Sequence, residues 1–407
     1  MRFLYRIVIL AVIVLCGLFL LKVPMTQKSQ TLLFALEDPV RDRYSYQQGY
    51  ARDCLTESRQ LIYDAMYAAV ESYEDEIILP VSGYSETDIE TVLISLLNDC
   101  PQFFWLNYSE WSYILNSDGV SILLSYHYSP SEIDSMQKKL NEQIGTLISL
   151  AEEESFKTEY EKAVYIHDAI AVMCEYDKTL NGKDIHNAYG ALVEKKAVCD
   201  GYAHALQLVL TQLGIECHYV TGEARGPDGP QGHAWNIVRL DGKYTTVDLT
   251  WNDIDSYMFE EFMAPSSDIT SHIYFGLSDE EMRQTHKADE RYYYPLPEAV
   301  DINWFSYNML EGPTPADIAD RASDQLIANI EKTIPYVEFR LTNRDAVSDF
   351  LEVYSGDIID AANAKLETKD FDKRFMNEMM CFVSDSDKGC ILIVVELGDP
   401  NIQATDE

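Results

Sequence analysis

Residues 195–222, KKAVCDGYAHALQLVLTQLGIECHYVTG, carry the pattern that decides the fold of the central part of the chain. Apolar residues recur at helical spacing between Leu206 and Leu213, and Gly214 follows at a position where helices commonly end. The pattern predicts a helix that begins near Cys199. At the start of a helix, unpaired N–H groups and the helix dipole favour a thiolate over a thiol, which makes Cys199 a candidate nucleophile. The alternative is that Cys199 packs as a small hydrophobic residue.

Two strand-like segments follow this helix. They read HAWNIVRL (233–240) and KYTTVDLTW (243–251). The dipeptide between them, Asp241-Gly242, is a strong signal for a two-residue hairpin turn. The sequence therefore predicts a β-hairpin directly downstream of the helix.

The register of this hairpin brings His233 and Asp248 together. Because the turn pairs residue 240 with residue 243, His233 faces Thr250 and Asp248 faces Trp235 in the predicted pairing. His233 and Asp248 are then diagonal neighbours on one face, whereas a slip of one residue would place them on opposite faces. Trp251 belongs to the same predicted strand and points to the other face. This register predicts an imidazole oriented by a carboxylate, the second half of a nucleophile–base–orienter set.

Three ordered motifs resemble the catalytic core of the transglutaminase-like superfamily, in its bacterial secreted branch: VCDGYA (198–203), GHAWN (232–236) and VDLTWND (247–253). Three further segments are also similar to that family: IHDAIAVMCEYD (166–177), HNAYGALVEKKAV (186–198) and YFGLSDEEM (274–282). The resemblance implies an α+β, papain-like fold, in which a helix carrying the cysteine packs on an antiparallel sheet carrying the histidine and the aspartate.

The resemblance also implies the roles of three residues. Cys199 is the nucleophile, His233 acts as general base and then as general acid, and Asp248 orients the imidazole. Papain-like enzymes often supply an upstream glutamine or a comparable donor to the oxyanion, and this sequence has no clear equivalent. The backbone N–H of Cys199 is the expected first donor.

The motifs leave the acceptor of the acyl group open. A thiolate attacks a carboxamide carbon and a thioester forms; water then gives peptidase or amidase action on a peptide or protein, which we favour. An amine in place of water gives the cross-linking reaction of a transglutaminase. A second class of function is a non-catalytic module that binds peptide or cell-wall material in the same groove. A third is an assembly protein that works through its flanking domains.

Side chains near these motifs are further candidates. Those predicted to contact substrate are Tyr202, Trp235 and Trp251, with ordinary packing as the alternative. A structural role is predicted for His204, and also for His167 with Asp168, because adjacent residues on a helix point apart.

Two other features flank the predicted site. Asn187 or Tyr189 would supply a polar group near the thiolate. The segment GEARGPDGPQG (222–232) reads as a flexible loop next to His233, and we predict that it gates the substrate, with a long connection as the alternative.

Composition limits the function of the whole chain. Its 407 residues include 31 Lys+Arg and 68 Asp+Glu, for a net charge of −37, and 47% are hydrophobic, as in globular proteins. Binding to nucleic acid needs a basic patch and is excluded as a leading function. An anionic membrane surface would repel this charge, so membrane contact must be hydrophobic.

The first residues supply such a hydrophobic segment. Arg2 and Arg6 precede the apolar run from Ile7 to Leu21, and we predict that residues 1–23 form a single uncleaved membrane anchor. The alternative is a signal sequence that is removed to release a secreted form. With no second span in the sequence, the acidic body is expected outside the cytoplasm.

The remaining chain divides into four predicted parts. They are a stalk (24–50), an N-terminal α/β region (51–155), the transglutaminase-like core (156–295) and a C-terminal α/β domain (300–407). Helical spacing predicts helices at 56–73, 87–98, 131–154, 315–333 and 344–366, and strand patterns predict a hairpin around 116–119 and strands at 337–341, 379–383 and 390–397.

Eight cysteines occur without a C-x-x-C pair or a Cys/His cluster at zinc-ligand spacing. Acidic residues do not show the spacing of a calcium loop either. We therefore expect no metal and no other cofactor. Cys54 with Cys100, and Cys381 with Cys390, are conceivable disulfides, and reduced buried thiols are the alternative.

Overall fold

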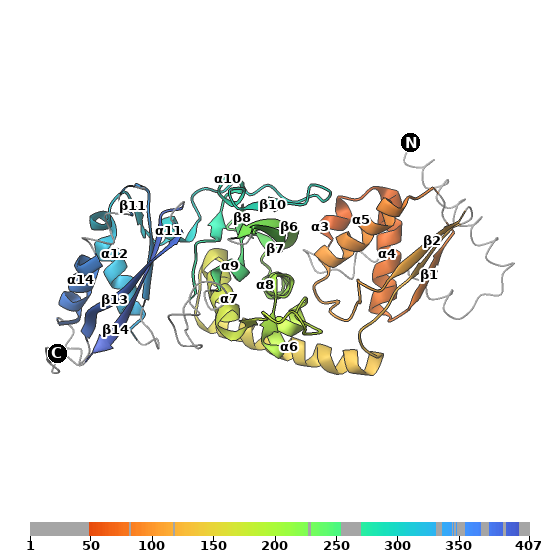
Figure 1. The fold of residues 1–407 in the computed structure, drawn as a ribbon. Helices are drawn as coiled ribbons and strands as arrows, with labels where there is room; N and C mark the ends of the chain where they lie inside the picture. The colour runs from red at the N-terminus through yellow and green to blue at the C-terminus, as the bar shows by residue number, and fades with distance from the viewer. Residues whose placement is uncertain are drawn as a thin grey trace. The chain divides into compact units, whose positions relative to one another are not determined.

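The computed structural model describes residues 49–80, 83–116, 119–226, 229–253, 270–330, 336–343, 345, 347, 355–367, 374–385 and 388–398 (Figure 1). The predicted anchor, 1–23, and nearly all of the predicted stalk, 24–50, lie outside these residues. Within the described ranges, no helix is both long enough and apolar enough to cross a membrane.

By its internal contacts the chain separates into two compact units. The first comprises Met1–Gly145 and Asp289–Tyr294, and the second comprises Thr146–Ala288 and Pro295–Glu407. Both combine helices with mostly antiparallel sheets, which confirms the predicted α+β class.

The first unit combines helices with a small antiparallel sheet. Its helices are α3 (Tyr50–Asp53), α4 (Glu57–Glu71), α5 (Glu86–Asp99) and the part of α6 (Pro130–Glu153) up to residue 145. Its strands, in the order β1-β3-β2, are Glu76–Leu79, Gly119–Leu123 and Ser112–Asn116. Side-chain caps at Thr56 and Ser85 explain where α4 and α5 begin. The helices and the hairpin predicted for this region are confirmed.

The motif residues lie in the second unit, on and around a five-stranded antiparallel sheet. In the order β10-β6-β7-β8-β9, its strands are His286–Ala288, Cys217–Gly226, Gly229–Leu240, Lys243–Val247 and Phe275–Leu277. Helix α8 (Cys199–Gln212) packs on β6 and β7 (Figure 1). At this interface the side-chain amide of Asn236 donates a hydrogen bond to the carbonyl of Ala203 at 3.0 Å. The predicted packing of the cysteine helix on the histidine strand is confirmed.

One longer helix and five short elements accompany this sheet. They are α7 (Glu159–Met173), β4 (Glu175–Tyr176), η2 (Gly190–Glu194), β5 (Lys196–Ala197), α9 (Leu249–Asn252) and α10 (Asp279–Met282). Helix α7, upstream of Cys199, and helix α9, downstream of β8, both contact α8 and also contact each other.

The C-terminal part of the second unit carries a four-stranded sheet. In the order β11-β12-β14-β13, its strands are Glu311–Gly312, Tyr336–Leu341, Cys390–Gly398 and Arg374–Asp385. The helices of this part are α11 (Trp304–Tyr307), α12 (Pro315–Ala328) and α14 (Ser355–Glu367). The predicted strands are confirmed; α12 ends before residue 333, and α14 begins at Ser355 within the predicted range 344–366.

The predicted disulfides do not form among the described residues. Cys54, Cys100 and Cys390 are free thiols. Cys390 lies opposite Asp385 of β13, and the backbone of Cys381 lies opposite Ile393, so strand pairing separates the two C-terminal cysteines.

Candidate active site

Cys199 is the first residue of α8, as the sequence predicts. Val198 before it has an extended backbone and provides no side-chain cap, so the N–H groups of the first turn have no capping side chain from that residue. Cys199 is partly exposed and packs against Ala203, Tyr219 and Ala234. A partly exposed sulfur at a helix start has the access and the local field that a nucleophile needs.

Gly201 determines how closely the start of α8 approaches the preceding segment. A Cβ at this position would lie 2.5 Å from the carbonyl oxygen of Ile185 and 2.7 Å from the Cβ of Ala197. The same Ile185 carbonyl accepts a hydrogen bond from the N–H of Val198 at 2.9 Å. The glycine of the VCDGYA motif therefore positions Cys199 through close backbone packing.

The register of the β7–β8 hairpin is as predicted. Leu240 lies opposite Lys243, and Asn236 lies opposite Val247. The two-residue turn therefore predicts correctly every observed residue pair between β7 and β8. His233, beyond the end of the β7–β8 ladder, is paired on its other side with Gly222 of β6.

The second strand is shorter than predicted. It ends at Val247, and residues 249–252 form α9, so the expected strand pairs of Thr250 with His233 and of Asp248 with Trp235 do not occur. Asp248 ends the strand because its Oδ1 accepts a hydrogen bond from the N–H of Trp251 at 3.1 Å, which is the geometry of an N-cap. The cap turns the chain away from the sheet directly after the strand.

His233 and Asp248 meet despite this difference. The Nε2 of His233 lies 2.7 Å from the Oδ2 of Asp248, and the two side chains are 8% and 0% exposed. Cys199 also lies close enough to His233 to raise the pKa of the imidazole. Because the carboxylate engages Nε2, Nδ1 is the ring nitrogen left to face the sulfur. The structure thus brings together Cys199, His233 and Asp248.

The charges of this set follow from burial and pairing. Burial alone would lower the pKa of His233, but the Asp248 carboxylate and the contact with Cys199 raise that pKa to about 10. Burial would raise the pKa of Asp248, but its hydrogen-bonded histidines hold that pKa well below its usual range. At neutral pH the pair is therefore an imidazolium and a carboxylate.

A second histidine, His286 of β10, shares the same carboxylate. Its Nε2 lies 2.9 Å from Oδ2 of Asp248, and its Nδ1 lies 2.8 Å from the hydroxyl of Thr285. Burial lowers the pKa of His286, so it is neutral and donates its Nε2–H to Asp248. The sequence analysis missed this residue because β10 reaches the site by pairing with β6, a contact that no local turn specifies.

Aromatic rings enclose the two histidines. The ring of Trp251 lies 5.7 Å from that of His233 and 4.5 Å from that of His286, and the ring of Trp235 lies 6.1 Å and 5.1 Å from them. Trp235 is buried, whereas Trp251 keeps part of its surface exposed. Both tryptophans therefore shield the ion pair from water, and Trp251 also has surface available to a substrate.

Tyr202 lies inside the domain rather than in the groove where we predicted it. It is fully buried; its hydroxyl donates to the carboxylate of Asp253 at 2.5 Å and lies 2.9 Å from the carbonyl oxygen of Cys174. These contacts, and not its spacing from Cys199, place the Tyr202 ring on the packed side of α8.

The polar groups predicted near the thiolate have local structural roles. Asn187 uses its side-chain oxygen to accept hydrogen bonds from the N–H groups of Tyr189 and Gly190. His204 stacks on Tyr219 with ring centroids 4.1 Å apart, and burial lowers its pKa to about 4, consistent with the structural role predicted for it.

The predicted gating loop is an extended hairpin. Gly222 to Gly226 belong to β6 and Gly229 to Gly232 belong to β7, with Gly226 opposite Gly229. Residues 227 and 228 lie outside the described part. Gly222 explains the close approach of β10, because a Cβ there would lie 2.1 Å from the carbonyl oxygen of Lys287.

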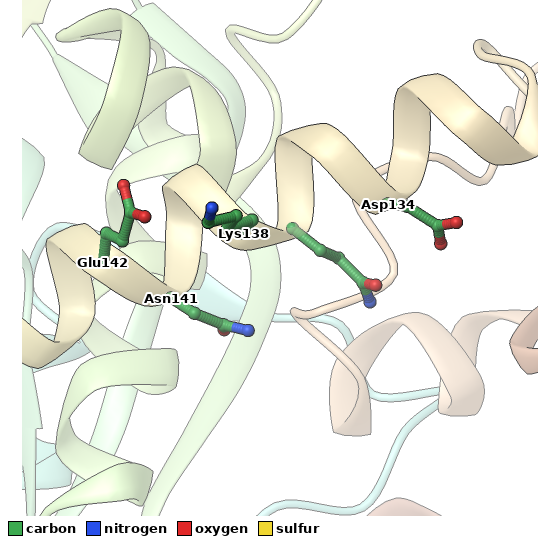
Figure 2. A pocket seen from close by; sticks show the side chains of 5 residues that line it. Asp134, Lys138, Asn141 and Glu142 are labelled. Carbon is green, nitrogen blue, oxygen red and sulfur yellow. The ribbon is translucent and has the colours of Figure 1, made fainter.

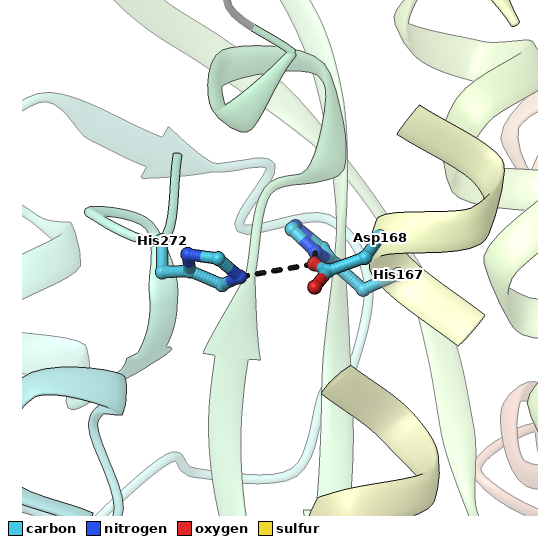
Figure 3. A group of neighbouring side chains, drawn as sticks. All are labelled: His167, Asp168 and His272. Carbon is cyan, nitrogen blue, oxygen red and sulfur yellow. Dashed lines mark hydrogen bonds and ion pairs between the residues drawn. The ribbon is translucent and has the colours of Figure 1, made fainter. Parts of the chain in front are cut away.

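A second cluster of two histidines and a carboxylate is formed by His167, Asp168 and His272; both histidines are buried, and Asp168 is partly exposed (Figure 3). His167 Nδ1 lies 2.8 Å and His272 Nε2 lies 2.9 Å from the same oxygen, Oδ1 of Asp168. We predicted that the neighbours His167 and Asp168 would point apart; they hydrogen-bond instead, because the carboxylate turns back toward the imidazole. His167 Nε2 in turn lies 3.0 Å from the side-chain amide of Asn252 in α9.

Hydrogen bonding argues against a metal at this second cluster. The N–H of Tyr274 donates to Oδ1 of Asn252 at 2.9 Å, which fixes the amide so that its NH₂ group donates to His167. His167 Nε2 is therefore an acceptor, and its Nδ1 carries the proton that bonds to Asp168. A protonated nitrogen cannot bind a metal, so the cluster is a chain of hydrogen bonds.

A hollow of about 530 Å³ lies on one face of α6 (Figure 2). It is lined by Asp134, Gln137, Lys138, Asn141 and Glu142. These side chains include no cysteine and no histidine, so the hollow does not offer a second thiol–imidazole pair.

Comparison with known proteins agrees with the geometry. Residues 149–249 match the model of the transglutaminase-like superfamily. This segment is a transglutaminase-like domain. It contains Cys199, His233 and Asp248, and the resemblance carried by the three motifs is confirmed.

The chain with this transglutaminase-like domain is also similar to individual proteins. It is 26% identical over 123 residues to kyphoscoliosis peptidase of Homo sapiens, covering 28% of this chain and 18% of that protein. It is 35% identical over 65 residues to the protein of the same name from Mus musculus, covering 14% and 10%. A solved structure described as a TGase is similar with a TM-score of 0.26 and 16% identity, over 46% of this chain and 53% of that one. The chain spans less than a fifth of the length of either peptidase.

Proposed function

We propose that the chain is a cysteine-dependent acyl-transfer enzyme that acts on amide bonds of peptides or proteins and passes the acyl group to water. The observation that carries this proposal is the contact set of Cys199, His233 and Asp248, in which a buried carboxylate holds a protonated imidazole beside a partly exposed sulfur. The match to the transglutaminase-like superfamily supports the chemistry, and the name of the two peptidases supports hydrolysis.

The residues divide the chemistry as follows. The thiolate of Cys199 attacks the amide carbon, and the carbonyl oxygen takes the electron pair, with the backbone N–H of Cys199 as a donor to the oxyanion. His233 gives its proton to the leaving nitrogen as the C–N bond breaks, which leaves a thioester and a free amine. His233 then takes a proton from water, and the hydroxide formed attacks the thioester and releases the acid and the thiolate. Asp248 holds the ring orientation throughout.

Transfer to an amine is the alternative to hydrolysis. The same thioester would then form a new amide with a lysine side chain, and Cys199 and His233 would play the same parts. A glutamine-containing peptide incubated with a tagged primary amine separates the two by mass spectrometry. Release of the free acid supports hydrolysis, whereas incorporation of the tag as the main product would replace hydrolysis with cross-linking.

The first experiment measures the reactivity of Cys199 itself. We expect iodoacetamide to label Cys199 below pH 7 much faster than Cys54, another partly exposed thiol, and we expect His233→Ala to remove that difference. Cys199→Ala should abolish turnover while the protein stays folded. Equal labelling of the two thiols would contradict the proposal and favour the non-catalytic peptide- or cell-wall-binding module, whose groove has no need of an activated sulfur.

We also propose where in the cell the protein acts: anchored in the membrane, with its body outside the cytoplasm. The apolar segment within residues 1–23 would hold the body outside the cytoplasm, where peptides, proteins or cell-wall material would be the substrates. Cell fractionation tests the anchor, and protease treatment of intact cells tests the orientation. Recovery of the full-length chain from the soluble cytoplasmic fraction would contradict the proposed place and leave the proposed chemistry untouched.

A further inference from the structure

The short helix α9, which begins directly after Asp248, is held at both ends by one segment of the chain. The N–H of Asp248 donates to the carbonyl of Tyr274 at 2.9 Å. At the other end, the carbonyl of Asn252 accepts from the N–H of Ser271, and its side-chain oxygen accepts from the N–H of Tyr274, both at 2.9 Å. Residues 271–274 therefore fix the position of the helix, and with it the carboxylate that caps the helix.

Glu338 of β12, in the C-terminal part of the second unit, holds this segment in turn. Its Oε1 accepts a hydrogen bond from the hydroxyl of Ser271 at 2.7 Å. Its Oε2 accepts from the backbone N–H of His272 at 2.9 Å and lies 3.3 Å from Nδ1 of the same residue. Glu338 is fully buried, and the ring of His272 stacks on Trp304 at 4.2 Å. Three donors thus meet one buried carboxylate.

A second route connects Glu338 to the same helix. His272 bonds to Asp168 (Figure 3), and Asp168 bonds to His167. His167 in turn accepts from the amide of Asn252 in α9. Burial would lower the pKa of His272, but Asp168 and Glu338 raise it to about 9, so its ring donates from both nitrogens at neutral pH. The chain of hydrogen bonds is continuous from β12 to the residue that ends α9.

We propose that Glu338 is a positioning residue for the acyl-transfer site, because it fixes the segment 271–274 that in turn fixes α9 and the catalytic carboxylate. This inference rests on the proposed function of Cys199, His233 and Asp248. Glu338 lies outside residues 149–249, the part that matches the family model. The C-terminal sheet is accordingly part of what assembles the active site in this chain.

The test compares two substitutions on or beside the same strand. Glu338→Gln removes the charge and one acceptor position but keeps the shape of the side chain. Glu311→Gln is the matched control, because Glu311 accepts from Arg340 of the same strand at 2.9 Å and has no bond to the segment 271–274 among those described. Alkylation of Cys199 in the full chain is measured from acid to alkaline pH, together with thermal unfolding.

We expect Glu338→Gln to slow alkylation of Cys199 at neutral pH by roughly 10-fold or more, the scale of losses when the outer partner of a functional histidine is removed. The acid side of the rate profile should also move to higher pH, since a displaced carboxylate holds the proton of His233 less well and the thiolate then has less cationic stabilisation. Glu311→Gln should keep the wild-type rate and pH profile at a similar loss of thermal stability. A purely structural role for Glu338 would lower the unfolding temperature and leave the profile unchanged.

Two further outcomes are distinguishable. If Glu338→Gln does not fold, Ser271→Ala removes one of the three bonds to the same carboxylate and should shift the profile in the same direction by a smaller amount; an unchanged profile would overturn the inference. If wild-type Cys199 shows no excess reactivity, the proposed function fails first. If the wild type is reactive and Glu338→Gln matches it, the positioning role alone is wrong.

Discussion

The substitution Asp248→Asn tests the charge distribution of the site directly. Asparagine can still cap α9 through its side-chain oxygen, so the fold around Trp251 is preserved. Its NH₂ group then faces Nε2 of His233, where Asp248 now accepts. The imidazole must accept at Nε2 and carry its proton on Nδ1, toward Cys199, and a neutral ring in that tautomer cannot take a proton from the thiol.

The magnitude follows from the pKa of His233. At 1.36 kcal/mol per pKa unit, the rise from 6.5 to about 10 corresponds to about 5 kcal/mol in favour of the imidazolium, part of which comes from the contact with Cys199. Without the carboxylate, burial dominates and the ring is neutral at pH 7. We expect kcat/KM to fall by about 10³- to 10⁴-fold, as when the aspartate of a serine-protease triad is replaced by asparagine.

The assay is the rate of Cys199 alkylation as a function of pH, which requires no substrate. Wild-type Cys199 should react from weakly acid pH upward, because the imidazolium of His233 lies beside the sulfur, whereas Asp248→Asn should react as an ordinary thiol. Asp200→Asn is the control. Oδ1 of Asp200 lies 4.0 Å from the sulfur, and removal of this negative charge should not slow the alkylation of Cys199. If Asp248→Asn kept the wild-type rate at neutral pH, the imidazolium–carboxylate assignment would be refuted.

Three further outcomes are expected. The pKa values of His233 and His272, about 10 and about 9, exceed the 6.5 of a histidine in the unfolded chain. The stability that these two groups contribute is therefore complete below about pH 6.5 and is lost as the pH rises through 9 and 10. Thermal unfolding measured against pH should show this alkaline loss of stability. His286→Leu removes a donor from a buried carboxylate and should cost about 1–3 kcal/mol of unfolding free energy in urea, whereas His286→Gln, which keeps a donor, should recover most of it. Gly201→Ala places a Cβ against a carbonyl oxygen and should cost about 1–3 kcal/mol by the same measurement, with less Cys199 labelling at neutral pH.

Local signals made part of the site predictable. The apolar spacing and Gly214 predicted α8 with Cys199 at its first residue. The Asp241-Gly242 turn fixed the β7–β8 register, because a two-residue hairpin allows one pairing. From these two features, Cys199, His233 and Asp248 could be named as candidates for the proposed chemistry.

Competing local preferences explain what was predicted wrongly. The segment 243–251 fits a strand by its alternation, but Asp248 is also a strong N-cap, and the cap ends the strand there. The segment 222–232 is rich in glycine and reads as a loop, yet its residues continue both strands of a hairpin, since pairing along β6 and β7 extends beyond the core. A competing local preference decided the first conformation, and pairing between the two strands decided the second.

Contacts between distant segments explain what was missed. His286 reaches Asp248 from 38 residues away, and Glu338 reaches His272 from 66 residues away. Neither histidine–carboxylate pair has a spacing that a helix or a hairpin would produce. A single sequence without its fold therefore gives no sign that these residues belong to the site.

The two histidine–carboxylate clusters distribute charge by the same rule. In each, one carboxylate meets two imidazoles; the pKa of one imidazole is raised and that of the other is lowered. A buried carboxylate offsets the charge of one imidazolium, and a second cation beside it would lack a partner. The two charged rings differ in what surrounds their second nitrogen, the one that does not bond to the shared carboxylate. In His272 this nitrogen faces Glu338, whereas in His233 it faces Cys199. The arrangement around His272 holds the surrounding segments in place. The arrangement around His233 leaves a proton where, in the proposed reaction, the leaving amine can take it.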